Sequence, residues 1–479
     1  MTRTKISKLS EEYLDKKVSV CGWVCKTHKP KKVVFVWLAD DATSRLSPIQ
    51  IVFSAGESID LDSVKKISKG YSISVTGILV RSPGKGQLYE LQASSYEIIG
   101  SVADQYSYPL MLDEYPMEYY RTSHLEHLEC LAPVKSTIYK IRSILSEASD
   151  DYFREQEFTK VHMPMITFSE CESGCGVFTV TSFSKTDQLS DFPVKADVLP
   201  AQIDFSKDFF GKKSSLTVSS QLELECSLPL GDVYCETRAA RCEESMTSRH
   251  LCEFTMIEFE RPFISSSVDI IDTAEDYVRF MFKRVLEKCD KELGFLGKQF
   301  SLDVKERLSH YLEKPFPRIT HADAVTLMLG QPDGTFSIKP SYSEDLSTEH
   351  EKWLSEIHFK TGVFVCRYPK AVKAFYMPVL TETPEESHGV EHVDSFDFLI
   401  DGLELIGGSA RIWRTSELES RITELGLDRK PLEYYIGLRR DGSAKSGGLG
   451  LGFDRLVKVV TGAPSIKDCV QFPRYVGCA

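Results

Sequence analysis

The stretch TSRHLCEF, residues 247–254, contains an arginine, a histidine and a glutamate and ends on a phenylalanine. A guanidinium group binds phosphate and an aromatic ring stacks on a base, so one interpretation is a nucleotide-binding site that uses Arg249 and Phe254. The other interpretation is a salt-bridged hairpin corner, because the following TMIEFE alternates apolar and acidic residues as a half-buried strand does. The stretch alone does not decide between these two interpretations.

Other stretches add residues of the same kinds in a fixed order. The glycine-rich run GGLGLGF is weak evidence for phosphate binding on its own, because such runs also form closely packed turns between a strand and a helix. In order, however, the stretches place arginine, glutamate, histidine and phenylalanine on antiparallel strands before a late glycine-rich run and an arginine. The set consists of HMPMI, ECESGCGVF, TVSSQLELE, ARCEESMTSRHLCEFTMIEFE, DFLIDGLELIGGSARI and GGLGLGFDRLV.

This ordered set resembles the three signature motifs of class II aminoacyl-tRNA synthetases, and more narrowly the subgroup that joins an N-terminal barrel to the catalytic domain. Pro164 in HMPMI is similar to the motif-one proline at the dimer interface. Residues 241–260 resemble motif two, and residues 450–456 resemble motif three with its arginine at Arg455. The resemblance covers nearly the whole chain and implies a homodimer that uses ATP to charge a tRNA.

In the reaction that this resemblance implies, a substrate carboxylate attacks the α-phosphate of ATP, so positioning and positive charge provide most of the catalysis. Arg241 is expected to bind the α-phosphate and the substrate carboxylate. Arg249 and Arg455 are expected at the γ-phosphate, and Phe254 and Arg455 on the two faces of adenine. The implied catalytic residues are Arg241, Glu243 and Arg455, and the implied ATP-binding residues are Arg241, Glu243, Arg249, His250, Phe254, Glu404, Gly452 and Arg455.

Two of these assignments have alternatives that the sequence leaves open. A histidine such as His250, beside a carboxylate, is as often a satisfied structural group as a catalytic one. Asp397 and Glu404 are seven positions apart in DFLIDGLE, and two convergent carboxylates in an ATP cleft suit Mg²⁺. The matching acids bind magnesium in the family, so we expect a Mg²⁺ site there, with ordinary surface acids as the alternative.

The amino acid that is activated is predicted from TVSSQLELE. Aspartate-activating members of the family carry a lysine two residues after the leucine of a QLxK pattern, and this position is Leu224 here, followed by Glu225. A carboxylate repels an aspartate side chain but accepts a hydrogen bond from an amide NH₂. Arg411 in GGSARI matches an arginine that would donate to the other side-chain atom. This pair predicts L-asparagine as substrate and tRNA(Asn) as partner.

The resemblance further implies that Glu172 meets the α-ammonium group of the amino acid, with Gln221 nearby. Three alternatives stay open. The chain could activate aspartate, it could be a catalytically inactive RNA-binding or signalling paralogue, and Glu225 could be an exposed acid on a strand. Within the subgroup, GDVYCETRAARCEES resembles eukaryotic and archaeal asparagine-activating forms more than bacterial ones.

The motifs also depart from the family pattern. Cys242 stands where the family has an alanine, and Glu244 stands where it has a glutamine or an asparagine. AKSGG replaces the usual PHGG or PHAG, so that Ser446 stands in the place of the histidine. These changes leave the expected phosphate and adenine contacts intact and affect fine positioning.

Residues 17–100 alternate as five short strands, with a helical segment between the third and the fourth. This order predicts a small OB-type barrel, a fold that commonly binds oligonucleotides. The basic run KTHKPKK, residues 26–32, would contribute salt-dependent affinity for phosphates. Phe35 lies on the opposite face of its strand from Val34 and Val36. It therefore either stacks on an unpaired base or packs against the catalytic domain. By resemblance, the residues that contact the central anticodon uridine are Phe35, Gln50 and Glu90.

The length of 479 residues predicts two or three domains. We expect a multi-domain α+β protein, with an OB-fold anticodon-binding barrel in residues 1–102, a linker in 103–133 and a class II catalytic domain, an antiparallel sheet flanked by helices, in 134–479. The net charge of 58 − 70 = −12 means that tRNA must meet a local basic patch. The thirteen cysteines are scattered and the chain shows no signal-like or membrane-spanning run, which predicts a cytoplasmic protein without structural zinc or a membrane partner.

Overall fold

The structure is a computed structural model that describes residues 2–55, 59–84, 86–112, 115–169, 171, 176–183, 193–195, 202–245, 247–381 and 388–478. The chain forms two compact units, Met1–Ile141 and Arg142–Ala479, and their boundary falls within helix α4 (Pro133–Glu155). None of the helices in the described ranges combines the length and the apolar character that a membrane span requires.

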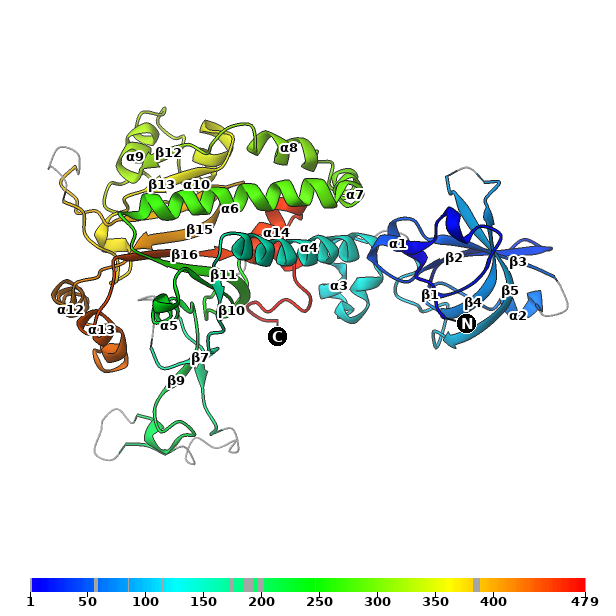
Figure 1. Cartoon of the computed structure of the whole chain (residues 1–479), viewed down its shortest axis with the longest axis horizontal. Helices are drawn as coiled ribbons and strands as arrows, with labels where there is room; N and C mark the ends of the chain where they lie inside the picture. Colours follow the sequence, from blue (N-terminus) through cyan, green and yellow to red (C-terminus); the bar gives the residue numbers. More distant parts are fainter. Residues whose placement is uncertain are drawn as a thin grey trace. The chain divides into compact units, whose positions relative to one another are not determined.

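The first unit contains a closed barrel with the strand order β1-β2-β3-β5-β4, which confirms the predicted OB fold (Figure 1). Its strands are β1 (Lys17–His28), β2 (Val33–Ala39), β3 (Ile49–Ser54), β4 (Ser72–Arg81) and β5 (Tyr89–Gly100). The predicted helix between β3 and β4 is the short α2 (Leu61–Val64), which begins at its capping residue Asp60. The sequence did not predict α1 (Ala42–Leu46), where the Asp41 side chain forms a capping box with Ser44.

The barrel closes because its strands alternate between an apolar inner face and a more polar outer face. Along β2, Val34, Val36 and Leu38 are fully buried, whereas Phe35 and Trp37 between them are only half-buried. Side chains alternate along a strand, so every second side chain points to the same face. The valines therefore fill the interior, and the aromatic rings lie outside. The predicted face of Phe35 is confirmed. A short α3 (Tyr119–Thr122) follows the barrel.

The second unit is built on a mostly antiparallel sheet whose strands, within the described residues, run in the order β12-β13-β14-β15-β16-β11-β10-β6. The strands are β6 (Thr159–Lys160), β10 (Val233–Ala240), β11 (Glu253–Pro262), β12 (Arg318–Thr320), β13 (Val363–Cys366), β14 (Ser395–Ile400), β15 (Leu403–Ala410) and β16 (Ser446–Gly452). A second sheet in the order β7-β9-β8 consists of β7 (Ile166–Thr167), β8 (Thr179–Val180) and β9 (Ser214–Leu216). The antiparallel sheet confirms the predicted fold class.

Helices cover one face of the large sheet. In Figure 1, α6 (green) runs along the strands, and the ring of Phe153 on α4 stacks on Tyr234 of β10 with the ring centroids 4.3 Å apart. Besides α4, the α-helices in the described part of this unit are α5 (Gln221–Glu225), α6 (Ser267–Lys288), α7 (Asp290–Phe300), α8 (Val304–Tyr311), α9 (His321–Leu329), α10 (Thr348–Lys352), α12 (Thr415–Glu424), α13 (Glu433–Arg440) and α14 (Phe453–Thr461).

The strand β11 is buried on both faces, so the expectation of a half-buried strand for TMIEFE is wrong. Ile257 and Phe259 lie on the side covered by helices, and the intervening acids Glu258 and Glu260 are equally buried. The acids can be buried because they have partners. Ser219 donates to Glu258, and Arg411 pairs with Glu260. The polar side of β11 therefore forms a lined site instead of a solvated surface.

Candidate active site

The turn between β10 and β11 positions the arginine and the phenylalanine of the opening stretch. Ala239 pairs with Phe254 across the two strands, and beyond the last pair the N–H of Arg241 donates to the carbonyl of Cys252 at 2.8 Å. This register places the Arg241 guanidinium 5.3 Å from the centroid of the Phe254 ring. Arg241 and Phe254 are thus neighbours at the neck of the loop, which the expected nucleotide site requires.

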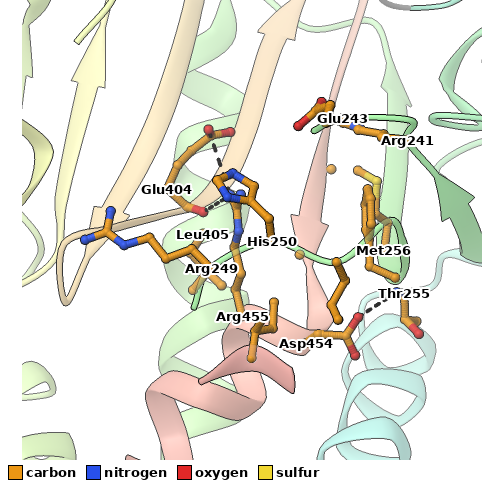
Figure 2. A pocket seen from close by; sticks show the side chains of 15 residues that line it. Arg241, Glu243, Arg249, His250, Thr255, Met256, Glu404, Leu405, Asp454 and Arg455 are labelled. Carbon is orange, nitrogen blue, oxygen red and sulfur yellow. Dashed lines mark hydrogen bonds and ion pairs between the residues drawn. The ribbon is translucent and has the colours of Figure 1, made fainter. Parts of the chain in front are cut away.

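These residues line a first cavity of about 280 Å³ (Figure 2). Its walls come from β11, β15, β16 and the start of α14, so segments far apart in the sequence meet there. Every residue predicted to bind ATP lies in its lining, which consists of Arg241, Glu243, Arg249, His250, Leu251, Phe254, Thr255, Met256, Glu404, Leu405, Gly450, Gly452, Asp454, Arg455 and Ile466.

His250 is hydrogen-bonded within the loop between β10 and β11. Its Nδ1 lies 2.8 Å from the hydroxyl of Ser245 and 2.7 Å from the hydroxyl of Thr247. Burial, together with the positive charge of Arg455, lowers the pKa of His250 and keeps the ring neutral. A neutral ring whose Nδ1 is hydrogen-bonded within its own loop favours the structural role over the catalytic one.

The other two arginines of the first cavity are held by acids. Arg455 lies 3.9 Å from the carboxylate of Glu404 and also donates to its backbone carbonyl, and Figure 2 shows the two side chains meeting beside His250. Arg249 lies 3.8 Å from Glu351 on α10. Burial and the carboxylates of Glu404 and Asp397 raise the pKa of Glu351 to about 8. Sequence reasoning missed Glu351.

A second cavity of about 420 Å³ shares Arg241, Met256, Glu404 and Gly450 with the first, so the two cavities meet at Arg241. Its floor is formed by the glycine-rich strands β15 and β16. At Gly448 an added Cβ would lie 2.1 Å from the carbonyl oxygen of Phe259 and 2.4 Å from Oε1 of Glu260, so the strands approach too closely for any side chain. The charged residues of its lining are Arg241, Glu258, Glu260, Lys373, Asp397, Glu404 and Arg411.

Arg411, immediately after β15, lies in a buried cluster of charges. Its Nε lies 3.2 Å from Glu260, its Nη2 donates to the same carboxylate, and its Nη1 donates to Ser409. Nε also lies 3.6 Å from Glu225. Burial raises the pKa of Glu260, and the adjacent Arg411 guanidinium opposes this rise and favours the charged carboxylate. Arg411 therefore lines the second cavity with most of its charge already neutralised by protein carboxylates.

Glu225 is fully buried at the end of α5, so the alternative of an exposed strand acid is wrong. Its carboxylate accepts from Tyr435 at 2.7 Å, from Gln221 at 3.1 Å and from Arg439. Gln221 lines the second cavity, and Glu225 is not among the described residues that do so. Glu225 thus lies behind the wall of the second cavity that its partners Gln221 and Arg411 form, and its expected contact with the substrate amide stays a prediction.

Asp397 and Glu404 lie on the paired strands β14 and β15, and both side chains approach Gly407. A Cβ on Gly407 would be 3.1 Å from Oε1 of Glu404 and 3.5 Å from Oδ1 of Asp397. Burial raises the pKa of Asp397 to about 6, while its ion pair with Lys373, 2.7 Å long, acts in the opposite direction. Both carboxylates lie beside Gly407, and carboxylate oxygens are the hard ligands that Mg²⁺ prefers.

The remaining predicted residues lie elsewhere. Glu172 is outside the described residues. Pro164 lines a groove of about 960 Å³ beside β7 and β9. In the barrel, the side chains of Gln50 and Glu90 are hydrogen-bonded at 3.1 Å across the pairing of β3 with β5. Phe35 lies on the neighbouring strand β2, stacked on His28 with the ring centroids 6.1 Å apart.

Sequence reasoning missed several residues of the site. Lys373 lies in the otherwise apolar stretch AVKAFYM, where a lone cation was a usable signal of a buried ion pair. Tyr435 and Arg439 lie in EYYIGLRR beside other charged residues and gave no such signal. Their partners Asp397 and Glu225 come from distant elements, so the pairing itself could not be read from the sequence.

Two families match the chain. The family described as tRNA synthetases class II (D, K and N) matches residues 119–476, and the OB-fold nucleic acid binding domain matches residues 18–99. The chain belongs to the class II tRNA synthetases of the aspartate, lysine and asparagine group.

Within this group, the chain is similar along its full length to asparagine–tRNA ligases. It is 36% identical to that of Cytophaga hutchinsonii, with 99% of this chain and 98% of the relative covered, and 35% identical to that of Clostridium kluyveri, with 100% of both covered. The asparaginyl-tRNA synthetase of Pyrococcus horikoshii complexed with asparaginyl-adenylate superposes with a TM-score of 0.83 at 27% identity over 100% of this chain and 99% of that one. These identities do not favour the expected likeness to eukaryotic and archaeal forms.

Proposed function

We propose that this chain activates L-asparagine with ATP and transfers it to tRNA(Asn). The asparagine carboxylate attacks the α-phosphate, which gives asparaginyl-adenylate and pyrophosphate, and the tRNA then accepts asparagine with release of AMP. Support comes from the full-length similarity to asparagine–tRNA ligases and from the union of two cavities at Arg241. In this proposal the first cavity holds ATP and the second holds the amino acid.

Arg241 is the residue proposed to bind the α-phosphate and the attacking carboxylate together, since a guanidinium group offers two parallel donors. Arg249 and Arg455 bind the terminal phosphates after exchanging their present acidic partners for phosphate oxygens. Phe254 and Arg455 enclose the adenine ring. Glu243, which lines the first cavity, accepts from the adenine amino group or the ribose. Asp397 and Glu404 would hold Mg²⁺, which supplies positive charge next to the phosphates when bound.

The charge of the second cavity is the observation that carries the choice of asparagine. Its described lining contains four carboxylates and three cations, and two of these cations, Arg411 and Lys373, form ion pairs with Glu260 and Asp397. An aspartate side chain would add a fifth carboxylate to this cavity. An asparagine amide adds no charge and can donate to and accept from neutralised groups. The cavity therefore favours the amide.

Other parts of the proposal concern the assembly. Phe35, Gln50 and Glu90 bind the anticodon, and their proximity on the barrel supports this role. The chain forms a homodimer through the region of Pro164, where the described residues Phe168 and Phe210 expose large apolar surfaces. The protein acts in the cytoplasm, which suits its reduced cysteines.

Pyrophosphate exchange, measured separately with each of the twenty amino acids, tests this proposal. We expect exchange with asparagine and more than a hundredfold less with aspartate. Equal or better use of aspartate would show that the second cavity was misassigned. No exchange with any amino acid, in an enzyme that still binds tRNA, would favour the inactive paralogue. Charging of tRNA(Asn) then tests the second step.

A further inference from the structure

Glu351 on α10 is a charged residue to which the proposed reaction gives no role. Its carboxylate lies 3.8 Å from the guanidinium of Arg249, and the side chains of Arg249 and Glu351 are 23% and 19% exposed. Arg249 lines the first cavity, and Glu351 is not among the described residues that do so. Glu351 therefore contacts, from outside the cavity, one of the two arginines that are proposed to bind the terminal phosphates.

Hydrogen bonds tie the backbone of Glu351 to the turn between β14 and β15. The hydroxyl of Ser355 donates to the carbonyl of Glu351 at 2.8 Å and accepts from the N–H of Gly402 at 2.9 Å. The residues that follow α10, Trp353–His358, form a π-helix, a rare conformation that is frequent at functional sites. Glu351 thus lies on a segment anchored to the large sheet, whereas Arg249 lies on the loop between β10 and β11.

The contacts that hold the two arginines of the first cavity are long. Arg249 lies 3.8 Å from Glu351, and Arg455 lies 3.9 Å from the carboxylate of Glu404. A close hydrogen bond between a guanidinium and a carboxylate is about 2.7–2.9 Å long, so neither ion pair is tight. A partly exposed ion pair of this length is weak, and a polyphosphate with several negative charges can replace the carboxylate.

The same arginines must bind a substrate and release a product. Adenylate formation leaves pyrophosphate where the terminal phosphates of ATP were bound, so groups that hold those phosphates tightly also retain the product. In many enzymes the release of product limits turnover. A carboxylate that competes for Arg249 weakens the complexes with ATP and with pyrophosphate alike, and it therefore shortens the lifetime of the pyrophosphate complex.

We propose that Glu351 is a positioning residue that competes with the terminal phosphates for Arg249 and thereby promotes the release of pyrophosphate. Glu351 holds the guanidinium group while the first cavity is empty, gives it up to ATP, and takes it back after the adenylate has formed. The inference rests on the proposed function, because that reaction leaves pyrophosphate beside Arg249. It is independent of which amino acid is activated.

Isothermal titration of the full-length protein with magnesium pyrophosphate tests this inference. The titration is made at pH 9, where the carboxyl group of Glu351, with a pKa of about 8, is charged. Glu351→Gln keeps the shape of the side chain and removes its charge, so we expect it to bind pyrophosphate at least fivefold more tightly than the parent protein. Its KM for ATP should fall as well, while its KM for asparagine stays unchanged. Glu351→Ala should show the same gain in affinity.

The direction of this change separates competition from a purely structural role, because damage to the fold would weaken binding. In an Arg249→Ala background, Glu351→Gln should change the affinity for pyrophosphate by less than twofold, since the contested arginine is gone. Glu356→Ala is the matched control. It removes an acid of the π-helix that lies 3.8 Å from Lys352 instead of a cavity arginine, and it should bind pyrophosphate as the parent protein does.

Three results would overturn the inference: weaker or unchanged binding in Glu351→Gln, an equal gain in Glu356→Ala, or a full gain in the absence of Arg249. Pyrophosphate exchange distinguishes this failure from that of the proposed function. A protein that shows no exchange with any amino acid contradicts the proposed function, and the titration still decides whether Glu351 competes for Arg249. Normal exchange without a gain in affinity in Glu351→Gln contradicts the inference alone.

Discussion

Among single side chains, Arg241 has the most direct proposed role, because it lines both cavities. We expect Arg241→Ala to lower asparagine-dependent pyrophosphate exchange by more than a hundredfold while tRNA binding stays nearly unchanged, since the barrel is a separate compact unit. Pyrophosphate-exchange assays measure the loss of activation, and filter binding measures the affinity for tRNA. Arg238→Ala, at an exposed position of β10, is the matched control. Exchange that survives within about tenfold, roughly 1.4 kcal/mol of barrier, would refute the α-phosphate role.

Glu225 should set the preference for asparagine through its neighbours. Glu225→Gln keeps the shape of the side chain but removes a charge that offsets Arg439 and Arg411. The Gln221 and Arg411 side chains, which line the second cavity, would lose a charged partner that holds them in place, so asparagine activation should fall by about ten- to a hundredfold, which corresponds to roughly 1.4–2.7 kcal/mol. Arg411 would also become a stronger attractor for an aspartate carboxylate, and the ratio of asparagine to aspartate activation should fall further still.

The rates of exchange with both amino acids, measured on the folded variant, test this prediction. Tyr435→Phe is the control, because it removes one hydrogen bond to Glu225 without changing any charge. It should weaken asparagine activation without changing the ratio. An unchanged ratio in Glu225→Gln would mean that residues outside this cluster select the amino acid.

The chemistry of this site was more predictable than its contacts. Motif residues such as Arg455 and Glu404, which are far apart in the sequence, line one cavity as expected, while their contact with ATP stays a prediction. The sequence could not indicate that Glu225 binds Arg439, which lies 214 positions later on α13. That pairing depends on how two helices pack, and no local pattern encodes it.

Secondary structure was predictable where periodicity is strong and unreliable where an element is short. The five barrel strands follow their alternation, and α2 follows its capping aspartate. By contrast, α5 has five residues, QLELE, whose alternation of polar and apolar side chains suits a strand equally well. Tertiary packing decides such cases, because a five-residue helix has little stability of its own.

The helix α9 gives the protein a dependence on pH. It begins at His321, whose side chain is fully buried, and burial lowers the pKa of this histidine from 6.5 to about 4. The unfolded chain therefore binds a proton more readily than the folded one. The folded protein is fully stable with respect to this group above about pH 6.5. As the pH falls towards 4, the free energy of unfolding decreases by about 3 kcal/mol at most.

Urea unfolding of His321→Asn at a series of pH values tests this expectation. The variant should be less stable than the parent protein at pH 7, and the difference in the free energy of unfolding should shrink as the pH falls from 6.5 to 4. His310→Asn, at an exposed position of α8, should leave the pH dependence unchanged. A difference that stays constant with pH would show that His321 is not held in its neutral form.

Across the whole chain, the two units should separate tRNA recognition from amino-acid activation. Phe35→Ala removes the half-buried ring beside Gln50 and Glu90 without touching the catalytic unit. Base stacking on an aromatic side chain contributes about 1–3 kcal/mol, so the KM for tRNA should rise by roughly tenfold or more. Pyrophosphate exchange, which needs no tRNA, should stay unchanged.

Aminoacylation kinetics at several tRNA concentrations measure this effect. Tyr106→Ala, which removes an aromatic ring that is 89% exposed outside the barrel strands, serves as the control and should leave the KM for tRNA as it was. A normal KM in Phe35→Ala would instead support the packing role that the sequence left open for this ring.

The close approach of β16 to β11 at Gly448 has a consequence for the gene. Gly448 has no space for a Cβ, because the carbonyl of Phe259 and the carboxylate of Glu260 occupy that position. Every one-base change that replaces a glycine codon by another amino-acid codon introduces at least a Cβ. Each missense allele at this codon should therefore disturb the partner of Arg411, whatever residue it encodes, and selection should remove all of them alike. The third base of the codon alone is free to drift.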